Sequence, residues 1–90
     1  MPANERSGHP WRSAARSTPA AAAAILLLAH RVRELRESHG ITQEGLASAS
    51  GIDGKHVQLL EAGKTNPTVA TVAVVASALG VRVDELFRSE

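Results

Sequence analysis

The chain has 90 residues, 43% of them hydrophobic, but it contains only one Phe, one Trp and no Tyr. This length allows a single domain, and a core of Leu, Val, Ile and Ala suits a small helical bundle. The lack of cysteine excludes a disulfide scaffold, a thiolate metal site and thiol catalysis, and a net charge of +1 gives little general attraction for polyanions.

Residues 1–17 predict a disordered tail. They contain Pro, Ser, Gly, Asn and three Arg, and they show no apolar period. We expect the single tryptophan, Trp11, to be exposed or loosely docked, with contact to a partner as the alternative. Structure is therefore expected to begin after Ser17.

The first helix is predicted to start at Thr18 and Pro19, because Thr caps helices and Pro is tolerated at the first helical position. It should end before Gly40, which suits a left-handed C-terminal cap. One buried face is indicated by the spacing of four residues: Ile25, Leu28, Val32 and Leu35.

Residues 18–30 form an N-terminal extension of this helix, and residues 20–29 are a continuous apolar run. A run of this length is too short to span a bilayer, which needs about 20 residues. Arg12 and Arg16 precede it as in a signal peptide, but cleavage after the run would cut into the first helix. We therefore expect a cytoplasmic protein without a membrane segment. The extension should either fray or pack on a second subunit.

Two short helices follow. Thr42 is the predicted N-cap of the second helix, with the acidic Glu44 in its first turn. Small Ala47 allows close approach of the two helices, and Gly51 suits the tight turn between them. The third helix begins after Asp53 and ends at Gly63, with Val57 and Leu60 on its inner face.

The fourth helix is predicted after Asn66-Pro67-Thr68 and stops at Gly80. The period of its inner face selects Val69, Val72, Ala73, Ala76 and Leu79. A last helix over residues 83–88 opens with two acidic residues and buries Leu86 and Phe87. No stretch alternates as a strand does, so the fold class is all-α.

Two short helices joined by a Gly-containing turn inside a helical domain are typical of DNA-reading helix-turn-helix proteins. Residues 31–87 resemble the Cro/cI-type (lambda-repressor-like, or Xre) helix-turn-helix domains. The matching positions, in chain order, are Arg36, Gln43, Leu46, Ala47, Gly51, Val57, Glu61, Gly63, Asn66, Pro67, Leu79, Gly80, Val81, Asp84, Glu85 and Leu86. The resemblance implies a five-helix lambda-repressor-like bundle with an extended first helix.

The resemblance also implies site residues. Gln43 resembles a clamp on DNA phosphate at a helix N-terminus. The third helix would be the recognition helix, with Lys55 and Gln58 as base readers and His56 and Leu59 beside them. The loop that grips backbone phosphates would contain Lys64, Thr65 and Asn66. Arg36 and Glu61 occupy the positions that pair in this family and tie the first helix to the third.

Four positions depart from the family pattern. Gly45 replaces a Glu that completes a capping box, which predicts a less stable second helix. Gly54 and Leu59 stand where polar base readers are common, and Arg82 stands where a Ser or Asn cap is usual. Leu59 suits either a thymine methyl or a protein interface.

The main hypothesis is a transcriptional regulator that binds double-stranded DNA as a homodimer, and it leaves repression and activation both open. Residues 31–87 contain six Lys and Arg against seven Asp and Glu, a formal charge of −1, so one copy alone should bind DNA weakly. The dimer contact is expected at Leu86 and Phe87, or else along residues 20–27.

The alternative is a protein-interaction or antitoxin-like module, in which Lys55 and Lys64 only form a solvated charged face and His56 is an ordinary surface histidine. The histidines lack the i, i+4 spacing of a helical metal pair, so we expect no metal and no cofactor. Ser50, Asp53 and His56 lack the third orienting group of a catalytic triad, so we expect no enzyme activity.

Overall fold

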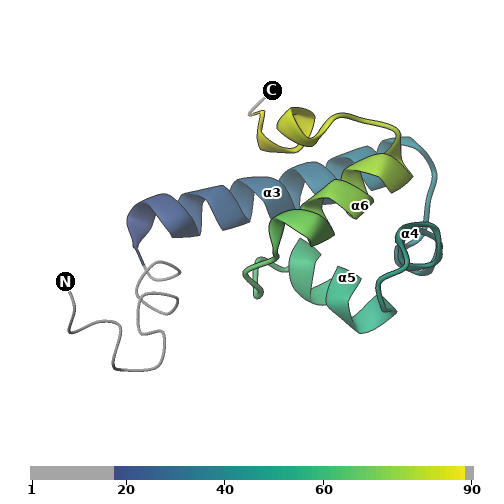
Figure 1. The fold of residues 1–90 in the computed structure, drawn as a ribbon, viewed down its shortest axis with the longest axis horizontal. Coiled ribbons are helices and arrows are strands. Elements are labelled where there is room, and N and C mark those ends of the chain that lie inside the picture. Colours follow the sequence, from purple (N-terminus) through teal and green to yellow (C-terminus); the bar gives the residue numbers. More distant parts are fainter. Residues whose placement is uncertain (1–17, 89–90) are drawn as a thin grey trace.

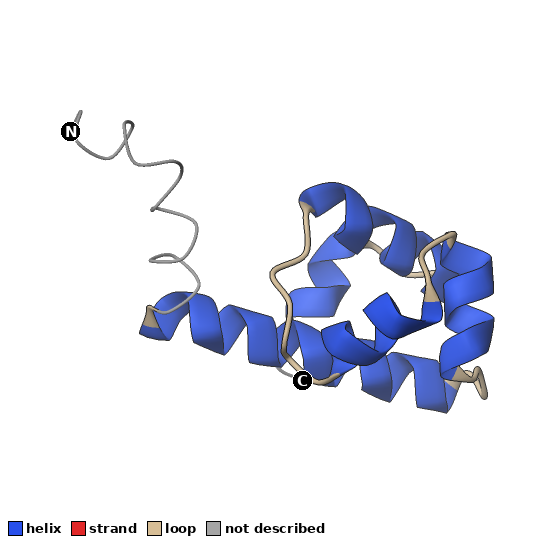
Figure 2. Ribbon diagram, turned by 90° about the horizontal axis from the view of Figure 1, so that it is seen from below, coloured by secondary structure: helices blue, strands red, loops and turns tan. Residues whose placement is uncertain are grey.

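The computed structural model describes residues 18–88, so the tail predicted for residues 1–17 lies outside the described part. This part contains helices and loops and no strand (Figures 1 and 2), which confirms the all-helical class. Its elements are the helices α3 (Pro19–Ser38), α4 (Gln43–Ser50), α5 (Gly54–Glu61) and α6 (Val69–Leu79) and the 3-10 helix η1 (Val83–Phe87).

Each α-helix begins at a side-chain cap, and the caps of the first three helices were predicted from the sequence. The hydroxyl of Thr18 accepts a hydrogen bond from the amide of Ala21 at 3.1 Å, and those of Thr42 and Thr68 do the same three residues ahead. The carboxylate of Asp53 accepts from the amide of Lys55 at 3.1 Å. These side chains satisfy amides that have no partner within the helix, and they fix where each helix starts.

The core is aliphatic. It lies where α5, α6 and η1 pack on α3, with α4 packed against α5 and α6. The large side chains that are fully buried come from every element: Val32, Leu46, Val57, Leu60, Val75 and Leu86. The N-terminal half of α3 projects past the bundle (Figure 1). None of the helices in residues 18–88 combines the length and hydropathy needed to cross a bilayer.

One prediction for the inner face of α6 is wrong. Val69 is 81% exposed, and the buried stripe consists instead of Val72, Val75, Ala76 and Leu79. Val69 is the first residue of the helix, before the point at which α6 meets the core. Because Val and Ala make up most of the helix, its apolar period did not specify which residues face inward.

The C-terminal segment also differs from the prediction. It is one short 3-10 helix that ends at Phe87, and although Leu86 is fully buried, Phe87 is 41% exposed. Adjacent residues of a 3-10 helix point about 120° apart, so only one of this pair can face the core. Arg31 holds the segment on α3 by donating a hydrogen bond to the carbonyl of Glu85 at 3.1 Å.

Two glycines near the α4–α5 turn should respond oppositely to substitution. Gly51 has φ +80°, whereas Gly54 has an ordinary helical conformation with no atom within 4 Å of an added Cβ. We expect Gly51→Ala to lower the free energy of unfolding by about 1–2 kcal/mol, because L residues are strained there. Gly54→Ala should raise it by about 0.5 kcal/mol, because the unfolded chain loses freedom. Urea unfolding of both variants checks this, and the same sign for both would contradict it.

Candidate nucleic-acid interface

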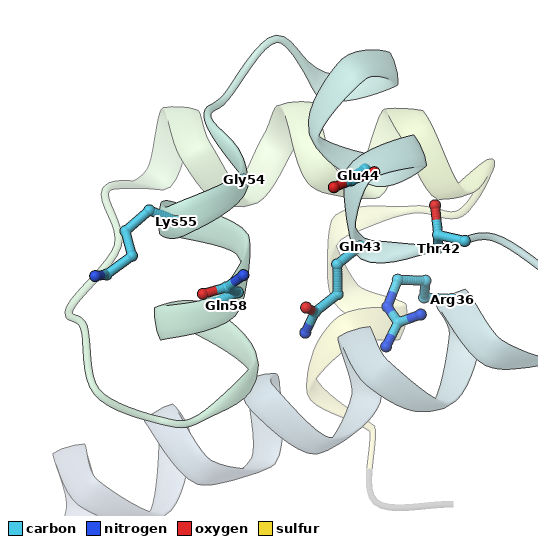
Figure 3. A pocket seen from close by; sticks show the side chains of 7 residues that line it. All are labelled: Arg36, Thr42, Gln43, Glu44, Gly54, Lys55 and Gln58. Carbon is cyan, nitrogen blue, oxygen red and sulfur yellow. The ribbon is translucent and has the colours of Figure 1, made fainter.

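Helices α4 and α5 meet around a tight turn. Leu46 and Ala47 are buried between them, and Gly51 ends α4 in the left-handed conformation that the sharp reversal requires. The outer sides of the two helices and the end of α3 enclose an open hollow of about 620 Å³. Seven residues line it (Figure 3): Arg36, Thr42, Gln43, Glu44, Gly54, Lys55 and Gln58.

Beneath this hollow, Glu61 joins three elements. Its carboxylate accepts hydrogen bonds from the guanidinium of Arg36 at 2.6 and 3.0 Å and from the amide of Gln43 at 3.0 Å. Arg36 also donates to the carbonyl of Ile41 at 2.8 Å. The hydrogen bond to Glu61 raises the pKa of Arg36 above its ordinary value, although burial acts against it. The start of α4 and the end of α5 are therefore fixed to the same point on α3.

The sequence predicted the Arg36–Glu61 pair but not the bond from Gln43. The only hint was that Gln43 is the first residue of the second helix, whose cap, Thr42, stands six residues after Arg36. Thr42, Glu44 and Gly54 were likewise not predicted to share a surface with the base readers. They line the hollow because the first turns of α4 and α5 face each other across it.

The cations of the described residues fall into two groups. Each arginine between residues 18 and 88 lies within 4.0 Å of a carboxylate: Arg31, Arg33, Arg36, Arg82 and Arg88. Within the same range, neither Lys55 nor Lys64 has an acidic partner, and both side chains are exposed. These two lysines are the cations whose charge is left for an external anion, and they stand in the first turn of α5 and in the loop that follows it.

The structure brings part of the predicted site together. The amides of Gln43 and Gln58 point into the hollow, while Lys55 extends outward from the start of α5 (Figure 3). His56 and Leu59 are half-buried on α5 and do not line the hollow. The loop after α5, which contains Lys64, Thr65 and Asn66, does not line this hollow either.

In that loop, Thr65 is half-buried and Asn66 is exposed, and Lys64 borders a second hollow beside α3. Within residues 18–88, no group of three or more His, Asp or Glu side chains is arranged to hold a metal ion.

Two short, capped helices around a left-handed glycine, with amides and uncompensated lysines on the outer side of the second, define a helix-turn-helix DNA-binding protein. The model of the helix-turn-helix family HTH_3, which includes the Cro/cI-type domains, matches residues 32–86. The chain belongs to this family and is a DNA-binding transcriptional regulator.

Similar proteins agree with this assignment. An uncharacterised helix-turn-helix transcriptional regulator of Sinorhizobium fredii is 40% identical over 60 residues, which cover 67% of this chain and 78% of the relative. Control protein C.SmaI of Serratia marcescens is 33% identical over 61 residues, 68% of this chain and 73% of that protein. The crystal structure of the restriction-modification controller protein C.AhdI from Aeromonas hydrophila has a TM-score of 0.70 and 37% identity, over 72% of this chain and 98% of that one.

Proposed function

We propose that this regulator binds a short palindromic operator in the cytoplasm as a homodimer and represses transcription by occupying it. In each copy, α5 enters the major groove. The observation that carries this proposal is the placement of Lys55 and Lys64, the two lysines without acidic partners, in the first turn of α5 and in the loop that follows α5. A recognition helix flanked by uncompensated cations is attracted to the backbone on both sides of the groove.

Within this arrangement, Lys55 and Gln58 read base edges, Lys at guanine acceptors and Gln at adenine. Gln43 clamps a phosphate at the start of α4, where free amides of the helix also favour an anion. Its hydrogen bond to Glu61 occupies one amide hydrogen and leaves the other available. Lys64, Thr65 and Asn66 grip the backbone, and His56 and Leu59 border the bases.

Two copies are needed because one domain offers few phosphate contacts. Its formal charge over residues 31–87 is −1, with six Lys and Arg against seven Asp and Glu. The affinity of a single copy should therefore be weak at physiological salt. A dimer on a two-fold axis matches a palindrome whose half-sites lie about 34–36 Å apart.

The two lysines should behave differently when removed. We expect Lys55→Ala to weaken binding to the preferred operator by about 1–3 kcal/mol and to relax preference at one base pair. Lys64→Ala should weaken binding to all sequences alike and make the salt dependence shallower by about one unit of slope. The operator is first selected from random DNA, and both variants are then titrated at several salt concentrations. Unchanged sequence preference in Lys55→Ala would contradict the role of α5.

A second candidate is a protein-interaction or antitoxin-like module. The half-buried Leu59 on the outer side of α5 favours it, because an apolar side chain suits a protein interface as well as a thymine methyl. The same selection separates the two functions. Enrichment of one DNA sequence supports operator recognition, whereas a selection in which no sequence is enriched supports the interaction module.

A further inference from the structure

Gly54 is the first residue of α5, and nothing in the described part of the protein requires a glycine there. Four of the six glycines in residues 18–88 have a positive φ, and an added Cβ at Gly45 would lie 3.1 Å from a side-chain carbon of Ile41. Gly54 has neither property, because its φ is not positive and no atom lies within 4 Å of an added Cβ. An alanine would fit this position and would favour the helix.

The space that the missing side chain leaves open belongs to the DNA face. Gly54 lines the α4–α5 hollow together with Lys55 and Gln58 (Figure 3). Residues four apart lie on the same face of a helix, so the open space over Gly54 lies one turn before Gln58, whose amide points into the hollow. The first residues of a recognition helix are those that meet the edges of the bases in the major groove.

We propose that Gly54 is a specificity-determining residue, which leaves room at the start of α5 for the C5 methyl group of one thymine in each half-site. The inference rests on the proposed function in one respect, namely that α5 enters the major groove. Glycine is the residue that allows a backbone to approach a ligand closely. The missing side chain is then required by the DNA and not by the fold.

The chemistry of glycine selects this group of the DNA. Gly54 has no side-chain donor or acceptor, so its side chain can distinguish bases only by the room that they need. In the major groove, the bases present hydrogen-bonding groups, which suit Lys55 and Gln58, and one apolar group, the thymine methyl. A methyl group that packs against the Cα atom of Gly54 leaves water, and this favours thymine over a base that lacks it.

The test removes the space and the methyl group separately. Gly54→Ala adds one heavy atom at the start of α5. Ala49→Ser is the matched control, because it adds one heavy atom to an exposed residue of α4 that does not line the hollow. The operator is the sequence that the wild type selects from random DNA. Each thymine of a half-site is replaced in turn by deoxyuridine, in both half-sites at once, which removes the methyl group and keeps the base pair.

We expect Gly54→Ala to weaken binding to the operator at least about tenfold, because a methyl group inserted into a close-packed contact displaces its neighbours. Ala49→Ser should bind within about twofold of the wild type, as is usual for an exposed residue outside a contact. At one thymine position, deoxyuridine should restore most of the affinity that Gly54→Ala loses. The same deoxyuridine should weaken the wild type about fourfold, the effect of one methyl group left out of the contact.

Equal affinity of Gly54→Ala and the wild type would overturn the proposal, as would an operator half-site without thymine. A loss that no deoxyuridine restores would assign the space to another group of the DNA. An equal loss in Ala49→Ser would show that the effect does not come from the hollow. A Gly54→Ala protein that is less stable than the wild type in urea would also contradict the proposal, because the fold would then require the glycine.

Failure of the proposed function looks different. If the wild type enriches no DNA sequence, operator recognition itself falls, and the role of Gly54 falls with it. If Lys55→Ala loses affinity for the selected operator while Gly54→Ala keeps it, α5 reads the DNA and only the role of Gly54 falls.

Discussion

Glu61→Ala is expected to lower the free energy of unfolding by about 3 kcal/mol, because it leaves the guanidinium of Arg36 buried without its partner. The side chain of Arg36 is 11% exposed and that of Glu61 4%, and their closest atoms are 2.6 Å apart. The other carboxylate near Arg36 is that of Glu37 at 4.0 Å, and because its side chain is 55% exposed it compensates the buried charge only in part. The amide of Gln43 loses its acceptor in the same variant.

Removal of both charges should cost less than removal of one. Apolar side chains of similar volume often replace a buried ion pair with little loss, so Arg36→Met with Glu61→Leu should recover part of the stability lost in Glu61→Ala. Full recovery is not expected, since Arg36 also holds the carbonyl of Ile41 in the α3–α4 turn. Urea unfolding of a double-mutant cycle measures the coupling.

The chain contains a control for this experiment. Arg33 and Glu37 make the same kind of contact at 3.2 Å, but their side chains are 64% and 55% exposed. Arg33→Ala removes this exposed pair and leaves Glu37 beside Arg36, so it should change the free energy of unfolding by less than about 0.5 kcal/mol. No coupling between Arg36 and Glu61, or equal losses in Glu61→Ala and Arg33→Ala, would rule out the buried-charge explanation.

The sequence predicted the features that depend on a few neighbouring residues. Helix starts follow from Thr18, Thr42, Asp53 and Thr68, since each cap binds amides only two or three residues ahead. Helix ends follow from glycines such as Gly51, since a left-handed cap depends on the conformation of that one residue. The Arg36–Glu61 pair connects distant elements, and it was predicted only through the resemblance to the family.

Features that depend on how the elements meet were not predicted. Val69 and Val75 are the same residue type in one helix, so only the position of α6 on the core decides that one is exposed and the other buried. The bond from Gln43 to Glu61 requires α4 and α5 to converge on α3. The hollow lined by Ala24, Val69 and Phe87 likewise exists only because the projecting half of α3, the start of α6 and η1 lie together.

Leu86→Ala should destabilise the protein more than Phe87→Ala, although Phe is the larger residue. Leu86 is fully buried against α3 and α6, so its truncation leaves a cavity and costs about 2–5 kcal/mol. Phe87 keeps 41% of its surface in water, and its truncation should cost about 1 kcal/mol in the monomer. Both are measured by urea unfolding at two protein concentrations, since self-association would add a concentration-dependent contribution through Phe87. A larger loss for Phe87→Ala that does not vary with concentration would show that Phe87, and not Leu86, anchors η1.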